Sequence, residues 1–214
     1  MSFGAILLAA GASDRMGTPK PLLHIQGQTF LEHILDGLDS LPEVEATVVV
    51  LGAKAAAIRD AVELGRAVPV THRGHKLGMF SSVRAGARAL VRRLPDLEGA
   101  LVVLVDMPLV RGETYERIVS AFQPDHDDAV LAAYQGEAGH PILLSRALAL
   151  RLADTALADP VEETLSDFLD AHAERRRYVD AHDPAVLINI NTPDAYRTHL
   201  GPDAVAPADG EEGL

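Results

Sequence analysis

The residues with the clearest capacity for chemistry lie in one short stretch of the sequence, from Leu8 to Lys20. It reads Leu-Ala-Ala-Gly-Ala-Ser-Asp-Arg-Met-Gly-Thr-Pro-Lys and follows an apolar run that has the composition of a buried parallel strand. Small residues let a backbone bend closely around a ligand and turn its N–H groups inward, as in phosphate-binding loops. Arg15 and Lys20 could balance phosphate charge. An ordinary strand-to-helix turn with two surface cations is the alternative, and the spacing matches neither the Walker loop nor the dinucleotide fingerprint.

A second candidate for chemistry is Asp106, which follows the most hydrophobic predicted strand, residues 100–105. In open α/β sheets, ligands gather beyond the carboxyl ends of the strands. Mg²⁺ takes oxygen ligands and commonly combines one or two carboxylates with substrate phosphates and waters. Asp106 is therefore a candidate Mg²⁺ ligand, and a structural turn cap before Pro108 is the alternative.

A third candidate is the segment 189–194, Asn-Ile-Asn-Thr-Pro-Asp, which ends the last predicted strand and begins a short helix. Thr192 is a good N-cap, and Pro193 suits the first helical position. One of the two asparagine side chains could offer a second oxygen to the metal. Helix capping alone would explain the Thr-Pro pair about as well.

The motif that opens the chain resembles the signature of a known family. Leu-Ala-Ala-Gly-x-Ser-x-Arg-Met-Gly-x-x-Lys, followed by Pro-Leu-Leu, is similar to the start of the MobA-like nucleotidyltransferases, which include the molybdenum cofactor cytidylyltransferases and guanylyltransferases. The resemblance runs through separated segments from residue 4 to residue 198. It implies a single Rossmann-like α/β domain with a doubly wound, mostly parallel sheet of the nucleotide-diphospho transferase type. It also implies Mg²⁺-dependent transfer of a nucleotide from a nucleoside triphosphate to a phosphorylated acceptor, with release of pyrophosphate.

This resemblance gives the candidate residues expected roles. Arg15, Lys20 and Asp106 would be the catalytic groups, and Asn191 would be the second metal ligand, with Asn189 behind it. The segment 77–86 resembles the family's Gly-Met-x-x-Ser segment, which lines the nucleotide, although its serines could equally cap a helix. The residues expected at the nucleotide are Leu8, Ala9, Ala10, Gly11, Ser13, Gly17, Lys20, Gly78, Ser81 and Ser82.

The sequence motifs indicate the substrates less clearly than they indicate the fold and the reaction. Ala at the third place of Leu-Ala-Ala-Gly and the segment 139–141, Gly-His-Pro, resemble the cytidylyltransferase branch and imply CTP and a molybdopterin acceptor, with a molybdoenzyme as a further partner. His140 could bind an acceptor phosphate or cap a turn. The asparagine pair at 189 and 191 is more similar to the guanylyltransferases. Residues 162–167 differ from the Gly-Asp-x-Gly pattern of the cytidylyltransferases. A sugar-phosphate or polyol-phosphate nucleotidyltransferase, or a noncatalytic nucleotide-binding partner in cofactor insertion, stays open.

Composition limits the class of protein. A chain of 214 residues with 48% hydrophobic residues can bury one sizeable core. A net charge of -12 argues against a nucleic-acid partner, and no apolar stretch approaches the roughly 20 residues that a membrane helix needs. The N-terminus lacks the basic region of a signal peptide, which predicts a cytoplasmic protein. The absence of cysteine excludes disulfides, thiolate zinc sites and a cysteine nucleophile.

Alternating strand and helix patterns with short connections predict helices on both faces of the sheet. Arg175, Arg176 and Arg177 form a short basic run, which is usually a solvated face. Residues 1–200 are expected to form the domain and residues 201–214 a disordered acidic tail. Besides the opening strand, strands are expected at 46–51, 68–70, 100–105, 129–134, 178–180 and 186–190. One helix is expected to start at residue 30, a second to end at residue 64 and a third to start near residue 81 or 82. Further helices are expected at 112–122, 146–152 and 161–171, and a break in the chain at 136–141.

Overall fold

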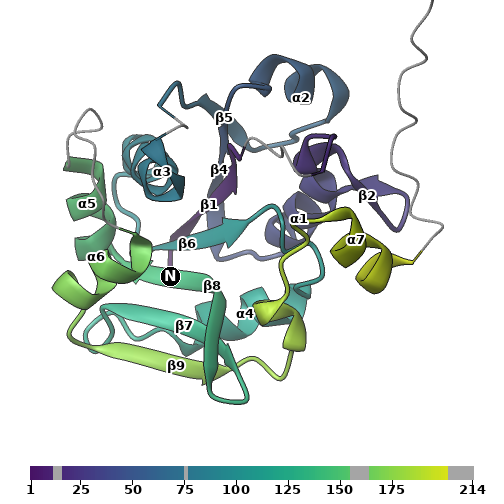
Figure 1. The fold of residues 1–214 in the computed structure, drawn as a ribbon. Coiled ribbons are helices and arrows are strands. Elements are labelled where there is room, and N and C mark those ends of the chain that lie inside the picture. Colours follow the sequence, from purple (N-terminus) through teal and green to yellow (C-terminus); the bar gives the residue numbers. More distant parts are fainter. Residues whose placement is uncertain (12–15, 75–76, 155–163, 202–214) are drawn as a thin grey trace, which may run out of the picture.

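The fold, a computed structural model that describes residues 1–11, 16–74, 77–154 and 164–201, is centred on a mixed sheet. Among these residues the main sheet has seven strands in the order β5-β4-β1-β6-β8-β7-β9 (Figure 1). Only β8 runs against its neighbours in this part of the chain, so the predicted mostly parallel α/β architecture is confirmed. The strands are β1 Phe3–Ala9, β4 Val44–Leu51, β5 Val68–Thr71, β6 Gly99–Leu104, β7 Ala129–Tyr134, β8 Glu137–Ser145 and β9 Arg176–Asp180.

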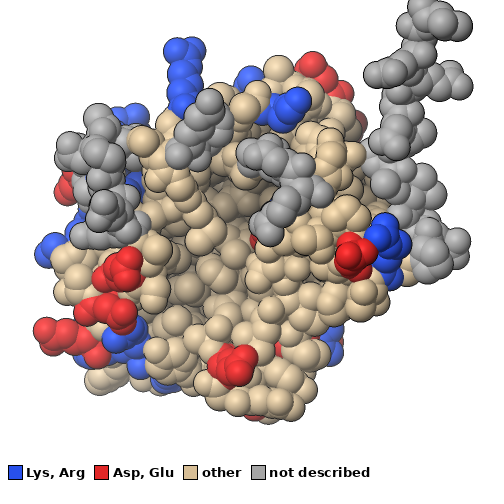
Figure 2. Space-filling view, viewed as in Figure 1, with Lys and Arg blue, Asp and Glu red and all other residues tan. Residues whose placement is uncertain are grey.

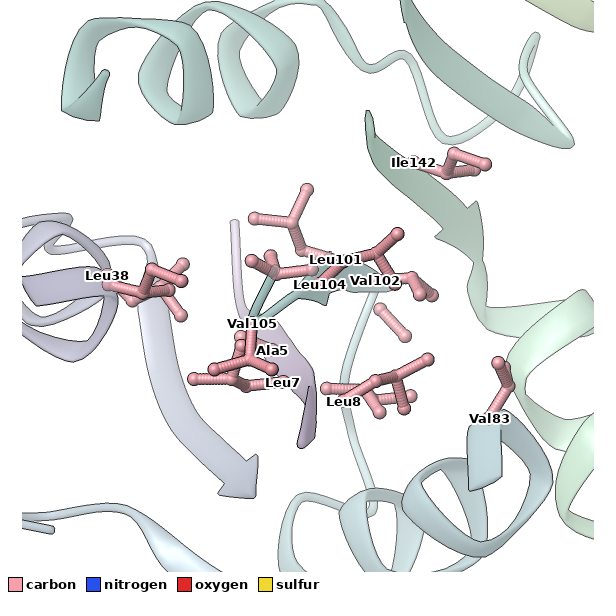
Figure 3. Close-up of a cluster of buried hydrophobic side chains, with 14 of the residues drawn as sticks. Ala5, Leu7, Leu8, Leu38, Val83, Leu101, Val102, Leu104, Val105 and Ile142 are labelled. Carbon is pink, nitrogen blue, oxygen red and sulfur yellow. The ribbon is translucent and has the colours of Figure 1, made fainter. Parts of the chain in front are cut away.

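The central strands are apolar throughout because helices cover both faces of the sheet. Every residue of β1 and of β6 is buried. In the parallel register, Leu7 of β1 lies between Val49 of β4 and Val103 of β6. Figure 3 shows the side chains of these central strands between Leu38 on one side and Val83 on the other. This packing fixes the ends of β1 and β6 beside each other.

The helices are divided between the two faces (Figure 1). Helices α3 (Met79–Arg93) and α5 (Arg146–Asp154) pack against each other on one face, and α1 (Phe30–Asp39) and α4 (Gly112–Ala121) pack on the other. No described helix is both long enough and apolar enough to cross a membrane. The remaining elements are η1 Lys20–Leu22, β2 His24–Ile25, β3 Gln28–Thr29, α2 Ala55–Ala61, α6 Leu165–His172, η3 Pro184–Leu187 and α7 Pro193–Leu200.

Two predicted helix starts are confirmed by their hydrogen bonds. The hydroxyl of Thr29 accepts a bond from the Glu32 N–H at 3.2 Å, and the Glu32 carboxylate accepts one from the Thr29 N–H at 2.9 Å. This reciprocal capping box begins α1. Thr192 caps α7 by accepting a bond from the Ala195 N–H at 3.1 Å, with proline at the first helical position.

The expected start of α3 at Ser81 or Ser82 is wrong. The helix begins at Met79, directly after Gly78, whose φ of 96° favours glycine. The hydroxyl of Ser81 donates to the Gly78 carbonyl at 2.7 Å, so this serine lies inside the first turn rather than at the cap. A serine followed by an apolar pattern is a good capping signal, but here the glycine two residues earlier sets the boundary.

The break expected at residues 136–141 is also wrong. The turn between β7 and β8 is the pair Gln135 and Gly136, with φ values of 51° and 87°, and β8 resumes at Glu137. A two-residue turn with both φ values positive matches the twist of a hairpin and needs no longer loop. The Gly-His-Pro segment 139–141 therefore lies within a strand.

The strand expected at 186–190 is replaced by the 3₁₀ helix η3. Pro184 stands at its start, and the Asp183 carboxylate accepts a bond from the Ala185 N–H at 3.1 Å. Val186 is fully buried without joining the sheet, because an apolar run can also be buried as a short helix. Helix α2 likewise ends at Ala61 rather than Leu64. Residues 161–163 of the expected helix 161–171, and residues 202–214 of the expected tail, lie outside the described residues.

Gly139 is the position where the fold has least room for a side chain. A Cβ added there would lie 1.9 Å from the carbonyl oxygen of Val186 in η3. We expect Gly139→Ala to lower the free energy of unfolding by about 2 kcal/mol or more, since η3 would have to move off β8. Urea denaturation measures this change.

Gly112 provides the matched control for this substitution. A Cβ added at Gly112 would meet no heavy atom within 4 Å. We expect Gly112→Ala to change the free energy of unfolding by less than about 1 kcal/mol. Equal stability of the two variants would contradict the tight contact between β8 and η3.

Candidate active site

A cavity of about 190 Å³ opens where β1 and β6 end, and the face drawn in Figure 2 is hollowed over β6. Both strands run parallel, so the segments that follow them start at the same edge of the sheet. The backbone continues this pairing for one residue, since the Val105 N–H donates to the Leu8 carbonyl at 3.1 Å. Residues from four separate segments line the cavity: Leu8, Ala9, Ala10, Gly11, Lys20, Pro21, Gly78, Met79, Ser82, Leu104, Val105 and Asp106.

Lys20 joins the groups that the sequence singled out. Its ammonium nitrogen donates to the Asp106 carboxylate at 2.9 Å and also to the side-chain oxygen of Asn191. The Lys20 and Asp106 side chains are 16% and 19% exposed, so water screens this ion pair only in part. The three residues come from η1, the end of β6 and the turn before α7. The structure thus brings together Lys20, Asp106 and Asn191 as the sequence predicted.

A backbone contact fixes the two oxygen-bearing residues relative to each other. The Ile190 N–H donates to the Asp106 carbonyl at 2.7 Å, which ties the turn before α7 to the end of β6. Asn189, the other asparagine of the pair, is exposed. Asn191 is therefore the asparagine that contacts Lys20, and the exposed Asn189 has no such contact among the described residues.

The donor set can be tested for a divalent cation. The oxygens of Asp106 and Asn191 both lie within hydrogen-bonding distance of one nitrogen, so they converge on a point where a positive charge already sits. A carboxylate and an amide oxygen are hard ligands of the kind Mg²⁺ accepts. Within the described residues no group of three or more His, Cys, Asp or Glu side chains converges. These two residues therefore fit a cation that takes its other ligands from a substrate.

The backbone just after β1 packs tightly against the segment that follows β4. A Cβ added to Gly52, just after β4, would lie 2.3 Å from the Ala10 carbonyl oxygen. Gly52 thus allows the backbone after β1 to approach that of β4, a contact that the sequence analysis did not identify. By contrast, a Cβ on Gly11 or on Gly17, whose φ is 72°, would meet nothing within 4 Å. Ser13 and Arg15 lie outside the described residues.

The two serines of α3 lie in different surroundings. Ser82 is buried and lines the cavity beside Gly78. Ser81 does not line it, and its hydroxyl lies 2.9 Å from Nε2 of His72 in addition to its bond with Gly78. Ser81 thus holds the turn before α3 in shape, while Ser82 is the serine placed to meet a ligand. Met79, which was not singled out in the sequence, is 51% exposed and also lines the cavity.

His140 lies in β8, is partly buried with its Nδ1 enclosed, and does not line the cavity. Burial lowers its pKa, although the Val102 backbone and the charge of Asp106 act in the opposite direction. The ring is therefore neutral near pH 7. Its Nδ1 has no hydrogen-bond partner within the described part of the chain.

The basic run 175–177 lies at another edge of the sheet. Arg175 pairs with Asp128 at 2.8 Å, and Arg177 pairs with Asp127. These ion pairs fasten β9 to the segment before β7. Residues of this run therefore stabilise the edge of the sheet through ion pairs, and the run does not line the cavity.

A known family of domains matches most of this sequence. The MobA-like NTP transferase domain matches residues 5–176. The chain belongs to this family. As a MobA-like protein it is a nucleotidyltransferase, and the cavity at the ends of β1 and β6 is the candidate place for its reaction.

Individual relatives agree with this assignment. The MobA-like chain is 29% identical over 213 residues to the molybdenum cofactor guanylyltransferase of Rhizobium meliloti (strain 1021), over 90% of this chain and 88% of that protein. It is also 30% identical over 151 residues to the bifunctional protein GlmU of Legionella pneumophila (strain Lens), over 68% of this chain. The match spans 31% of GlmU.

A solved structure extends the similarity to three dimensions. The crystal structure of Rv0371c from Mycobacterium tuberculosis H37Rv superposes with a TM-score of 0.77 at 28% identity, covering 94% of this chain and 97% of that one. A second structure of Rv0371c is a complex with manganese, with a TM-score of 0.71 at 26% identity, covering 94% and 98% of the two chains. The seven-stranded sheet of the described residues thus has the MobA-like architecture.

Proposed function

We propose that this protein transfers the cytidylyl group of CTP to a molybdopterin cofactor and releases pyrophosphate. The observation that carries the proposal is the bond of the Lys20 ammonium to both Asp106 and Asn191 at the edge of a cavity that begins with a small-residue loop. Cations and hard oxygen ligands beside such a loop suit a nucleoside triphosphate with a divalent cation.

The chemistry follows from the charges involved. A phosphate oxygen of the acceptor attacks the α-phosphorus, a new P–O bond forms, and the bond from that phosphorus to the β-phosphate bridge breaks. The electron pair leaves with pyrophosphate. Lys20 and Arg15 would offset negative charge on the phosphate oxygens as it redistributes. This reaction needs no protein nucleophile, since positioning and electrostatics supply most of the catalysis.

Asp106 and Asn191 would hold Mg²⁺ at the triphosphate, with Lys20 released to a phosphate oxygen. Such a cation supplies charge stabilisation and a template that orients the phosphates. The manganese complex of Rv0371c supports a divalent metal in this family. Around it, Leu8, Ala9, Ala10, Gly11, Ser13, Gly17, Gly78 and Ser82 would contact the nucleotide. We assign Ser81 to holding the turn, and His140 to positioning the acceptor.

A second candidate is guanylyl transfer from GTP to the same acceptor. Two observations favour it: the relative from Rhizobium meliloti is a guanylyltransferase, and this chain carries asparagine at both places of the pair at 189 and 191. The Leu-Ala-Ala-Gly loop and the Gly-His-Pro segment favour CTP. Both candidates share the acceptor and the residues that bind the phosphates, so they differ only in the base.

We expect Lys20→Met and Asp106→Ala each to reduce turnover by about 10²-fold or more, because each removes a charge that acts on the triphosphate. The assay is pyrophosphate release in Mg²⁺ with CTP, GTP, ATP and UTP in turn, first with molybdopterin cofactor and then with a panel of sugar phosphates. Lys54→Met and Asp60→Ala, which remove exposed charges of the same types on α2 and before it, are the matched controls and keep full activity.

Each outcome of this assay bears on a named alternative. Release with CTP and cofactor supports the proposal, and release with GTP supports the second candidate. Release only with a sugar phosphate transfers the function to sugar nucleotide synthesis. Binding of a triphosphate without release under any combination indicates a noncatalytic partner.

We expect Asn191→Ala to raise the Mg²⁺ concentration for half-maximal activity on the order of tenfold, because it removes one oxygen at the metal. Asn189→Ala, which changes the exposed asparagine two residues away, leaves this concentration unchanged. The measurement is a titration of MgCl₂ into enzyme treated with EDTA. An unchanged Mg²⁺ dependence of Asn191→Ala would contradict its role as a metal ligand.

A further inference from the structure

Two hydrogen bonds join the segment that contains Lys20 to the segment that contains Asn191. The first is the bond of the Lys20 ammonium to the Asn191 side-chain oxygen. The second joins α7 to the β2–β3 hairpin beside it (Figure 1), where the Tyr196 hydroxyl donates to the His24 carbonyl at 2.8 Å. Both segments are fully described, and between them these are the two hydrogen bonds that the structure forms.

Tyr196 is the residue that attaches α7 to the rest of the fold. Among the residues of α7, all of which are described, it alone is buried, with 5% of its surface exposed. Its ring packs against Phe30 at the start of α1, with 6.0 Å between the ring centroids. Burial raises the pKa of Tyr196, although the bond to the His24 backbone acts in the opposite direction, so the hydroxyl keeps its proton and donates.

Short hydrogen-bonded turns connect this hydroxyl to the site on both sides. The Tyr196 N–H closes the first turn of α7 by donating at 3.0 Å to the carbonyl of Thr192, the cap residue that follows Asn191. On the side of the hairpin, the residue before the acceptor carbonyl is Leu23, whose N–H donates to the Lys20 carbonyl at 3.1 Å. The position of Tyr196 is therefore transmitted to Asn191 through one turn of backbone.

The proposed function requires the first of the two bonds to open. There, Lys20 moves to a phosphate oxygen while Asn191 stays at Mg²⁺, and the present inference rests on that proposal. The turn that carries Asn191 is then held on one side by the bond of the Ile190 N–H to the Asp106 carbonyl. On the side of the hairpin, the bond from Tyr196 is the hydrogen bond that remains between the two described segments.

We propose that Tyr196 is a positioning residue for the metal-dependent transfer. Its hydroxyl keeps α7 against the β2–β3 hairpin, and so keeps the Asn191 oxygen beside Asp106 while Lys20 is bonded to a phosphate. Tyr196 does not line the cavity, so it acts through Asn191 and not by touching a substrate. The role belongs to the hydroxyl, because a phenylalanine at this position retains the ring that packs on Phe30.

Titration of MgCl₂ into enzyme treated with EDTA tests this role, with molybdopterin cofactor and with CTP or GTP in separate series. We expect Tyr196→Phe to raise the Mg²⁺ concentration for half-maximal activity about fivefold, the equivalent of one ordinary hydrogen bond. The value of kcat at saturating Mg²⁺ stays within about twofold of the parent, because the reacting groups are unchanged. Binding of Mn²⁺ to the enzyme with a non-hydrolysable CTP or GTP analogue, followed by electron paramagnetic resonance, weakens by the same factor without any turnover.

A double variant separates positioning from a general loosening of the fold. Tyr196→Phe combined with Asn191→Ala needs no more Mg²⁺ than Asn191→Ala alone, because no oxygen is left to position. Ser145→Ala is the matched structural control. It removes a buried hydroxyl that accepts a bond from the Leu148 N–H at 3.4 Å, at the opposite end of β6 from Asp106. This control lowers the thermal stability and leaves the Mg²⁺ requirement unchanged.

The outcomes distinguish this proposal from the proposed function. If Asn191→Ala raises the Mg²⁺ requirement and Tyr196→Phe changes neither that requirement nor the Mn²⁺ affinity, the positioning role is overturned and the proposed function stands. An additive effect in the double variant also overturns it, since Tyr196 would then act on the fold as a whole. No change in either single variant overturns the metal role of Asn191 and the positioning role together.

Discussion

The contact of the Lys20 ammonium with Asp106 and Asn191 is the interaction on which the account of this site depends. It joins η1, the end of β6 and the turn before α7, which are far apart in the sequence. A partly buried lysine between a carboxylate and an amide oxygen is stable only because the three segments meet at one edge of the sheet. In the proposed function, this small region exchanges a protein cation for a substrate and its metal.

The sheet supplies the rigidity that this contact requires. β1 and β6 are neighbours, fully buried and in parallel register, so the loop after β1 and Asp106 after β6 start side by side. The bond of Ile190 to Asp106 then fixes the approach to Asn191. β8 runs in the opposite direction beside β6, and Gly139 of β8 lies so close to Val186 that η3 packs directly on this strand. Each layer of the fold thus positions one part of the site.

Much of this arrangement follows from local sequence signals. The apolar strands β1, β4 and β6, the Thr29 capping box and the Thr192-Pro193 helix start are each specified by residues within one turn or strand. Asp106 could also be picked out as a candidate from local sequence, since it follows a buried parallel strand and ligands collect at the ends of such strands. The grouping of Lys20, Asp106 and Asn191 was predicted through family resemblance, which carries information about the sheet order that local patterns lack.

The errors of the sequence analysis arise where a distant contact decides the outcome. Residues 139–141 look like a break because they contain glycine and proline, yet Gly139 is needed for a close approach of Val186 across the fold. Val186 is apolar and buried, but it packs in η3 rather than in the sheet. Ser81 has the character of a cap, whereas His72 and Gly78 determine its place.

The most direct test of the central claim is a crystal structure of this protein with Mn²⁺ and a non-hydrolysable CTP analogue, with the metal located by anomalous scattering. The account predicts one manganese ion bound to oxygens of Asp106 and Asn191 and to the triphosphate, with the Lys20 ammonium moved from between them onto a phosphate oxygen. A manganese ion bound elsewhere, with Lys20 still bonded to both residues while the nucleotide is present, would contradict it.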